Sequence, residues 1–94
     1  MGRIIAFDIG DKRIGVAISD PFNEMALPVE TYWRKSLTKD VDYLVALAKS
    51  RYAETIVCGL PLNFDGKECE QTEKTRFFIE ELKKKTDINV VTQD

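Results

Sequence analysis

The sequence predicts an α/β fold with a mixed sheet of five strands and two helices packed against it. Three short runs with strand character come first, joined by short links. Two units follow in which a helical stretch precedes an apolar run. Short links favour antiparallel neighbours and helical crossovers favour parallel ones, so the first three strands should be antiparallel and the later ones parallel. At this length, we expect residues 1–94 to form a single domain.

The first two strands are predicted to form an antiparallel hairpin. Residues 3–7 (RIIAF) have the length and isoleucine content of a buried strand, and they end at Asp8. Residues 13–19 alternate isoleucine and valine with smaller side chains, which is the period of a strand. The link between these runs is short and contains glycine and aspartate, as hairpin turns often do.

The third strand and the first helix follow a loop at residues 20–23. Residues 28–34 hold β-branched and aromatic side chains, and the leading proline predicts an edge strand. Ser36 is suited to cap the next element, a helix over residues 37–50. The apolar residues of that helix recur at helical spacing: Leu37, Val41, Leu44, Val45 and Ala48.

The remaining elements alternate between strand and helix. Residues 55–58 (TIVC) predict a fourth strand, in which Cys58 is expected to be a core thiol. A second helix is predicted over residues 70–85, and its basic end complements the helix dipole. Residues 89–92 begin a fifth strand. The apolar stripe of the second helix consists of Thr75, Phe78, Ile79 and Leu82.

Composition excludes several classes of site. The chain has no histidine, so zinc sites and histidine-based triads are excluded and any metal or acid–base chemistry must use carboxylates. The net charge of −2 provides no overall attraction to nucleic acid, so such a partner needs a local basic patch. No apolar run is long enough for a membrane span or a signal peptide, and we therefore predict a cytoplasmic protein without membrane contact.

Asp8 is the first candidate functional residue, and three interpretations are open for it: a turn residue, an acid at a phosphate site, or a metal ligand. Aspartate is common in turns, which favours the first. The end of a strand also places a carboxylate rigidly at the rim of a sheet, where α/β folds bind ligands. A buried acid there would need a cation, a metal or several N–H donors.

The residues around Asp8 suggest how a ligand would be held. Gly10 and Gly15 let the backbone turn or approach a bulky ligand closely. Lys12 and Arg13 are suited to phosphate oxygens, although a solvated hairpin tip explains them equally well. The loop from Gly59 to Asn63 follows the fourth strand, and it would lie beside Asp8 if the first and fourth strands are neighbours.

A second basic cluster precedes the first helix. It consists of Arg34, Lys35 and Lys39, next to the aromatic residues Tyr32 and Trp33. Interleaved basic and aromatic side chains can bind nucleic acid. A solvated helix start with aromatic residues in the core is at least an equal explanation.

Three stretches together resemble the YqgF/RuvX family over essentially the whole chain. They are FDIGDKRIGVAISDP, the element from Pro28 to Thr31, and VCGLPLNFDGKE followed by a helix with Gln71 and Arg76. The resemblance implies a ribonuclease H-like fold. Members are described as nucleases that mature the 5′ end of pre-16S rRNA and as Holliday junction resolvases. The resemblance therefore implies a nuclease that uses Mg²⁺ or Mn²⁺ and acts on precursor RNA or branched DNA.

The resemblance also assigns roles to individual residues. Asp8 matches the catalytic, metal-binding aspartate of the first strand, and Asp94 aligns with a later acidic position that would also bind metal. The predicted nucleic-acid contacts are Lys12, Arg13 and Asn63. Close approach of the backbone is expected at Gly10, Gly15 and Gly59.

The sequence departs from the family pattern at its end. Family members continue past the fifth strand with further acidic residues and a last helix, which this sequence does not contain. Because two-metal hydrolysis needs several carboxylates, we expect little or no activity from these 94 residues alone. Apolar surface left uncovered without that helix predicts association, for example as a homodimer.

Two hypotheses of other classes stay open. An acid and two glycines in a hairpin after the first strand also bind nucleotide phosphates in actin-like ATPases and sugar kinases, although those proteins need a second similar domain. A module that binds nucleic acid or protein without catalysis would use the acids structurally. Its binding would depend on salt but not on metal.

Overall fold

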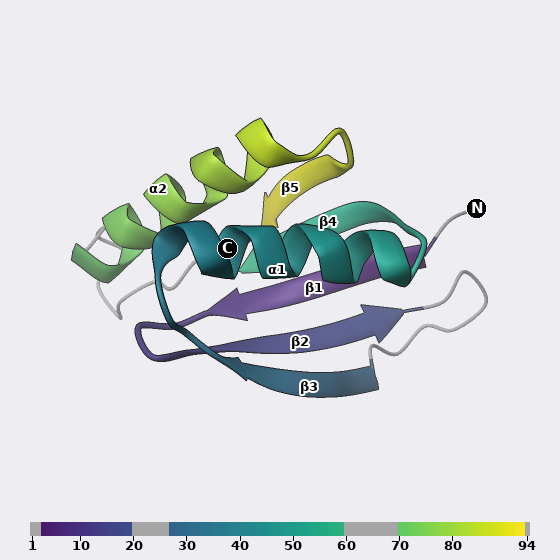
Figure 1. Cartoon of the computed structure of the whole chain (residues 1–94), viewed down its shortest axis with the longest axis horizontal. Helices are drawn as coiled ribbons and strands as arrows, with labels where there is room; N and C mark the ends of the chain where they lie inside the picture. Colours follow the sequence, from purple (N-terminus) through teal and green to yellow (C-terminus); the bar gives the residue numbers. More distant parts are fainter. Residues whose placement is uncertain (1–2, 20–26, 60–69, 94) are drawn as a thin grey trace.

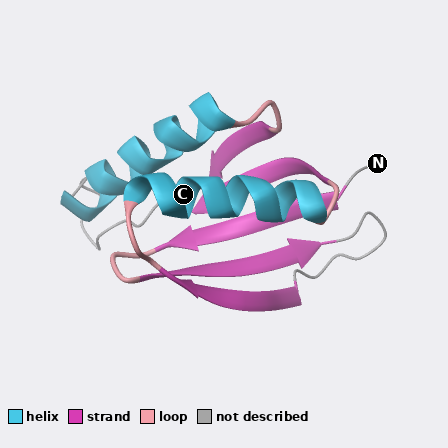
Figure 2. Cartoon of the chain, in the orientation of Figure 1, coloured by secondary structure: helices cyan, strands magenta, loops and turns pink. Residues whose placement is uncertain are grey.

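The structure is a computed structural model that describes residues 3–19, 27–59 and 70–93 (Figure 1). Five strands and two helices follow one another along the chain (Figure 2). They are β1 (Arg3–Ile9), β2 (Arg13–Ser19), β3 (Leu27–Trp33), α1 (Leu37–Ser50), β4 (Ala53–Gly59), α2 (Glu70–Lys85) and β5 (Asn89–Gln93).

The strands form one mixed sheet in the order β3-β2-β1-β4-β5. The pairs β1–β2 and β2–β3 are antiparallel, whereas β1–β4 and β4–β5 are parallel. This arrangement confirms the predicted α/β class and the predicted change from antiparallel to parallel pairing. It also confirms β3 as an edge strand and places β1 in the centre of the sheet.

Both helices contribute to one hydrophobic core on a single face of the sheet. Figure 1 shows α1 lying across the sheet with α2 beside it. In β1, Ile5, Phe7 and Ile9 are buried, as the two-residue period of a strand requires for one covered face. The predicted apolar stripe of α2 is confirmed, because all four of its residues are buried: Thr75, Phe78, Ile79 and Leu82.

The opposite face of the sheet carries no helix within the described residues. The side chains of Ile4 and Val91 remain 42% and 39% exposed there, and Asp8 is exposed as well. Uncovered apolar surface of this kind is consistent with the predicted association, but the homodimer stays a prediction. In the described part of the chain, no helix has the length and apolar character to cross a membrane.

Two strands extend further than the sequence predicted, and this changes the position of two candidate residues. β1 continues through Asp8 to Ile9, so Asp8 lies inside the strand and not where the strand meets the turn. β4 continues to Gly59, which is therefore a strand residue and not the first residue of a loop. The reason is sheet pairing, since both residues have partners on a neighbouring strand.

Candidate functional site

Asp8 lies between two glycines at the centre of the sheet. Its partner on β2 is Gly15 and its partner on β4 is Gly59. A Cβ atom built on Gly15 would lie 3.7 Å from the Asp8 Cβ, and one built on Gly59 would meet nothing within 4 Å. The open face of the sheet is therefore unobstructed on both sides of the Asp8 side chain, and a ligand can reach the carboxylate.

Two hollows meet at Asp8. The smaller, of about 280 Å³, is lined by Asp8, Gly10, Arg13, Gly15 and Thr31. The larger, of about 400 Å³, shares Asp8, Gly15 and Thr31 with it and is lined by residues of all five strands. The structure thus brings together Asp8, Arg13 and the three predicted glycines around one accessible carboxylate.

The other predicted site residues do not gather there. Lys12 lines a different cleft, on the helix side of the hairpin. Asn63 and Asp94 lie outside the described residues. The first and fourth strands are neighbours, which was the condition for Gly59 to lie beside Asp8. β4 pairs in parallel with β1 and places Gly59 directly opposite Asp8.

Gly10 is required by the hairpin turn. Its N–H donates to the Arg13 carbonyl at 3.0 Å, and a Cβ atom at Gly10 would lie only 2.9 Å from that carbonyl oxygen. We therefore expect Gly10→Ala to lower the free energy of unfolding by about 1–3 kcal/mol, as overpacking does. Gly59→Ala is the matched control, because its new methyl group enters open space. Denaturant unfolding measures both; equal effects would contradict this role for Gly10.

The family resemblance implies divalent metal ions, and the described residues offer one ligand for them. Asp8 provides the hard carboxylate oxygen that Mg²⁺ or Mn²⁺ prefers, in a hollow with room for an ion. Within residues 3–19, 27–59 and 70–93, no group of three acidic or thiol side chains could hold a metal. Asp8 therefore fits as one ligand, and the other ligands must come from elsewhere.

A buried acid in the first turn of α1, Asp40, was not predicted from the sequence. Asp40 is 1% exposed and receives three hydrogen bonds. The Tyr32 hydroxyl and the Lys35 N–H each donate to Oδ1 at 2.9 Å, and Arg34 Nε donates to Oδ2 at 3.0 Å. A signal was present, because residue 40 falls on the same helical face as Leu37 and Leu44 and an acid there needs partners.

These contacts set the ionisation of Asp40. Burial alone would raise the pKa of this carboxyl, but the hydrogen bonds from Lys35, Arg34 and Tyr32 and the charge of Arg34 outweigh it. The pKa of Asp40 therefore lies below its ordinary value, and the group is ionised at neutral pH. Burial and the same carboxylate raise the pKa of the Tyr32 hydroxyl, which stays protonated as a donor.

Arg34 connects the hairpin to both helices. Its Nη1 donates to the Gly10 carbonyl at 2.9 Å, and its guanidinium lies 4.9 Å from the centre of the Phe78 ring on α2. With the ion pair to Asp40 on α1, one side chain fixes three elements against each other. Arg34 therefore holds the turn that carries Lys12 and Arg13. The alternative that Arg34 belongs to a solvated helix start is wrong for this residue.

Cys58 is confirmed as a core residue. Its side chain is fully buried in β4, and burial raises the pKa of the thiol to about 12. Because the thiolate is the reactive form, Cys58 is inert at neutral pH and is not a nucleophile.

Comparison with known proteins places the chain in a family. The sequence model of the RuvX family, described as "Holliday junction resolvase", matches residues 2–94. A protein from Nitrobacter winogradskyi named "Putative pre-16S rRNA nuclease" is 43% identical over 89 residues, which cover 95% of this chain. The aligned part is 55% of that relative, so the chain spans about half the length of the curated relative.

Solved structures share the fold at low sequence identity. RuvC from Thermus thermophilus has a TM-score of 0.66 at 8% identity, over 97% of this chain and 63% of that one. A Bacteroides thetaiotaomicron protein with an actin-like ATPase fold has a TM-score of 0.60 at 12% identity, over 98% and 32%. Both likenesses concern the fold alone, which is α/β and ribonuclease H-like as in RuvC. The match over residues 2–94 shows that the chain belongs to the RuvX family.

Proposed function

We propose that the protein is a metal-dependent nuclease whose main substrate is the 5′ end of pre-16S rRNA in the cytoplasm. One observation carries the proposal: an exposed carboxylate, Asp8, stands in an open hollow between two glycines at the centre of the sheet. An acid that serves only a turn has no need of such a position. The name of the Nitrobacter relative supports the choice of substrate.

The residues of the hollow have separate tasks in this proposal. Asp8 would hold Mg²⁺ or Mn²⁺, and the ion, when bound, would supply activation of water and stabilisation of the charge on the leaving oxygen. Arg13 lines the same hollow and binds a phosphate oxygen of the substrate. Gly15 and Gly59 leave room for the sugar–phosphate backbone to approach the sheet.

Two residues outside the described part are assigned to the proposed site. Asp94 directly follows Gln93, which lines the larger hollow together with Asp8, and we assign Asp94 as a second metal ligand. Asn63 belongs to the segment after Gly59, the neighbour of Asp8 in the sheet, and we assign it to substrate binding. Further carboxylates are needed to hold two metal ions about 4 Å apart.

A Holliday junction resolvase is the second candidate function. It is favoured by the description of the family whose model matches residues 2–94. A four-way DNA junction presents the same phosphates to Asp8 as a folded RNA does, so the chemistry of the site would be identical.

A cleavage assay tests both functions. The full-length protein is incubated with Mn²⁺ and with either a labelled precursor of the 16S 5′ end or a four-way DNA junction, with EDTA as the control. We expect cleavage of the RNA in Mn²⁺ and none in EDTA. Cleavage of the junction alone would transfer the proposal to the second function. Cleavage of neither, or cleavage in EDTA, would contradict a metal-dependent nuclease.

A further inference from the structure

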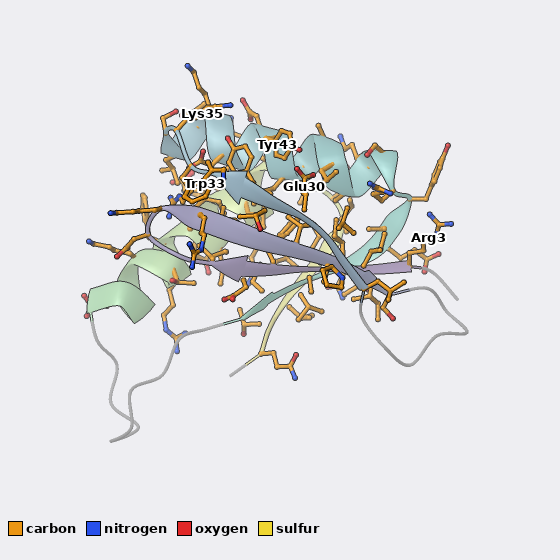
Figure 3. All side chains as sticks on the ribbon, turned by 90° about the horizontal axis from the view of Figure 1, so that it is seen from below. Arg3, Glu30, Trp33, Lys35 and Tyr43 are labelled. Atoms are coloured by element: carbon orange, nitrogen blue, oxygen red, sulfur yellow. The ribbon has the colours of Figure 1, made fainter. Side chains whose placement is uncertain are left out.

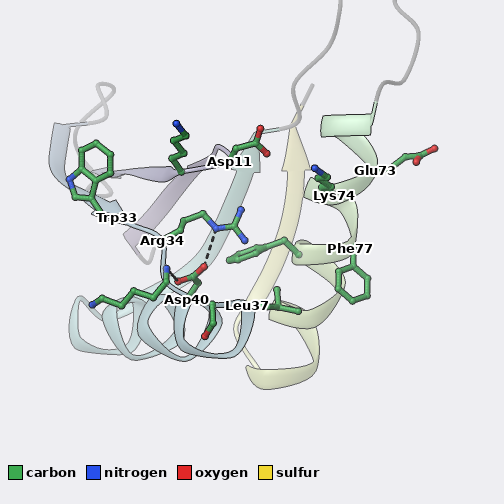
Figure 4. Close-up of a pocket in the computed structure, with 12 residues that line it drawn as sticks. Asp11, Trp33, Arg34, Leu37, Asp40, Glu73, Lys74 and Phe77 are labelled. Carbon is green, nitrogen blue, oxygen red and sulfur yellow. Dashed lines mark hydrogen bonds and ion pairs between the residues drawn. The ribbon is translucent and has the colours of Figure 1, made fainter.

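A large cleft lies on the helix side of the β1–β2 hairpin, away from the face that carries Asp8. Its volume is about 850 Å³, and its walls come from the hairpin turn, the β3–α1 junction and α2 (Figure 4). Its lining includes Lys12, Trp33, Lys35 and Phe77, which define what we call the aromatic–basic groove. None of these four side chains has a part in holding metal at Asp8.

Two large aromatic side chains border the groove. Trp33 is 61% exposed and Phe77 is 58% exposed, and Figure 4 shows them on opposite sides of the cleft. Between them lies the Arg34–Asp40 ion pair, which is anchored to Phe78 and the hairpin. The groove therefore has a rigid floor and two exposed aromatic platforms, an arrangement typical of a binding surface.

The charge of the groove differs from that of the chain. Four basic residues line it, Lys12, Arg34, Lys35 and Lys74, against three acids, Asp11, Asp40 and Glu73. The buried Asp40 and Arg34 form an ion pair and neutralise each other, which leaves Lys12, Lys35 and Lys74 against Asp11 and Glu73. The lining is thus net positive in a chain whose net charge is −2, and this favours an anionic ligand.

The groove and the Asp8 hollow adjoin the same hairpin tip. Lys12 lines the groove, and the next residue, Arg13, lines the hollow that contains Asp8. The Arg13 guanidinium also lies 5.9 Å from the centre of the Trp33 ring, which links the two regions. A chain of phosphates bound at Asp8 can therefore pass the tip and enter the groove.

We propose that the aromatic–basic groove binds unpaired nucleotides that flank the phosphate held at Asp8. Bases stack on Trp33 and Phe77, and phosphates contact Lys12 and Lys35. Stacking on aromatic side chains requires bases that are free of a duplex, so the ligand is single-stranded. The inference rests on the proposed function only in naming Asp8 as the position of the scissile phosphate.

Binding without cleavage tests the groove. Full-length protein in EDTA is titrated into a fluorescein-labelled single-stranded uridine oligonucleotide, and fluorescence anisotropy is measured. Phe77→Ala should weaken binding about tenfold or more, as expected for one lost base stack. Tyr52→Asn is the matched control, because Tyr52 is 79% exposed outside the groove and asparagine tolerates its positive φ of 57°.

The salt dependence of the same titration tests the lysines. The double variant Lys12→Ala/Lys35→Ala should reduce the slope of log K against log salt by about 0.7 for each lysine. Lys49→Ala/Lys85→Ala removes two exposed lysines outside the groove and should leave the slope unchanged.

The outcomes separate this inference from the proposed function. Asp8→Asn should retain oligonucleotide binding in EDTA, so a protein that cleaves nothing can still confirm the groove. An unchanged affinity in Phe77→Ala would overturn the inference even if the nuclease is active. A duplex of the same sequence that bound as tightly as the single strand would also overturn it. So would a protein that did not bind the oligonucleotide and instead bound a protein partner through Phe77.

Discussion

Replacing Asp8 with asparagine should lower kcat/KM for RNA cleavage at least about a hundredfold. Mutation of groups that merely support metal ligands commonly costs up to about a hundredfold, and loss of a ligand charge should cost no less. The fold should not change, because the Asp8 side chain is exposed on the open face of the sheet and neither sheet partner has a side chain. The measurement is steady-state cleavage of labelled precursor by the full-length protein in Mn²⁺.

Asp42→Asn is the control for this experiment. It removes an equal charge from an exposed position on α1, remote from the hollows around Asp8. Its kcat/KM should match that of the unaltered protein. If Asp8→Asn were as active as Asp42→Asn, then Asp8 would have no part in the chemistry and would be a structural residue of β1.

Asp40→Ala should cost the largest loss of stability, about 3 kcal/mol in the free energy of unfolding. Breaking a buried ion pair leaves its partner uncompensated, and here two further donors, the Tyr32 hydroxyl and the Lys35 N–H, also lose their acceptor. Urea unfolding of the full-length protein at pH 7 measures it. The matched control is Asp42→Ala, an exposed acid of the same helix, which should change stability by less than about 0.5 kcal/mol.

The effect of Asp40 should depend on pH. Because the pKa of Asp40 is lower in the folded protein than in the unfolded chain, its stabilising contribution is present above pH 4 and declines as the pH falls. The difference between the unaltered protein and Asp40→Ala should therefore be smaller at pH 3 than at pH 7. A difference that stays constant, or grows on acidification, would show that the carboxylate charge is not what stabilises this network.

The sequence was sufficient to predict the order of the elements along the chain and the change from antiparallel to parallel strands, because local patterns are strong here. The alternation in β2 and the apolar stripes of α1 and α2 each have the period of one structure. Ser36 caps α1 as predicted, accepting a hydrogen bond from the Lys39 N–H at 3.3 Å. The right-handed crossover rule then limited the ways in which β4 and β5 join the sheet.

The ends of the central strands needed the tertiary structure. Aspartate and glycine are rare in strands, so both strands were predicted to end before Asp8 and Gly59. Pairing across three strands keeps both in the sheet, so that the acid sits between glycines. The three contacts of Arg34 could not be predicted from the sequence either. Gly10 lies 24 positions before Arg34 and Asp40 lies six positions after it. The third partner, Phe78, belongs to the second helix.

The candidate site was predicted in part. Asp8, Arg13 and the three glycines come together as expected, whereas Lys12 belongs to a separate groove. The roles of Asp94 and Asn63, the homodimer, and the inactivity of these 94 residues alone stay predictions. The nucleotide-binding alternative also stays a prediction.

The most direct test of the account is where a divalent cation binds. Paramagnetic Mn²⁺ is added in small amounts to the isotope-labelled full-length protein, and amide signals are followed by NMR. If Asp8 holds the metal, the amides of its two partners, Gly15 and Gly59, should broaden first, and Asp8→Asn should abolish the broadening. Broadening that leaves these two glycines unaffected, or that persists in Asp8→Asn, would contradict Asp8 as the metal-binding carboxylate.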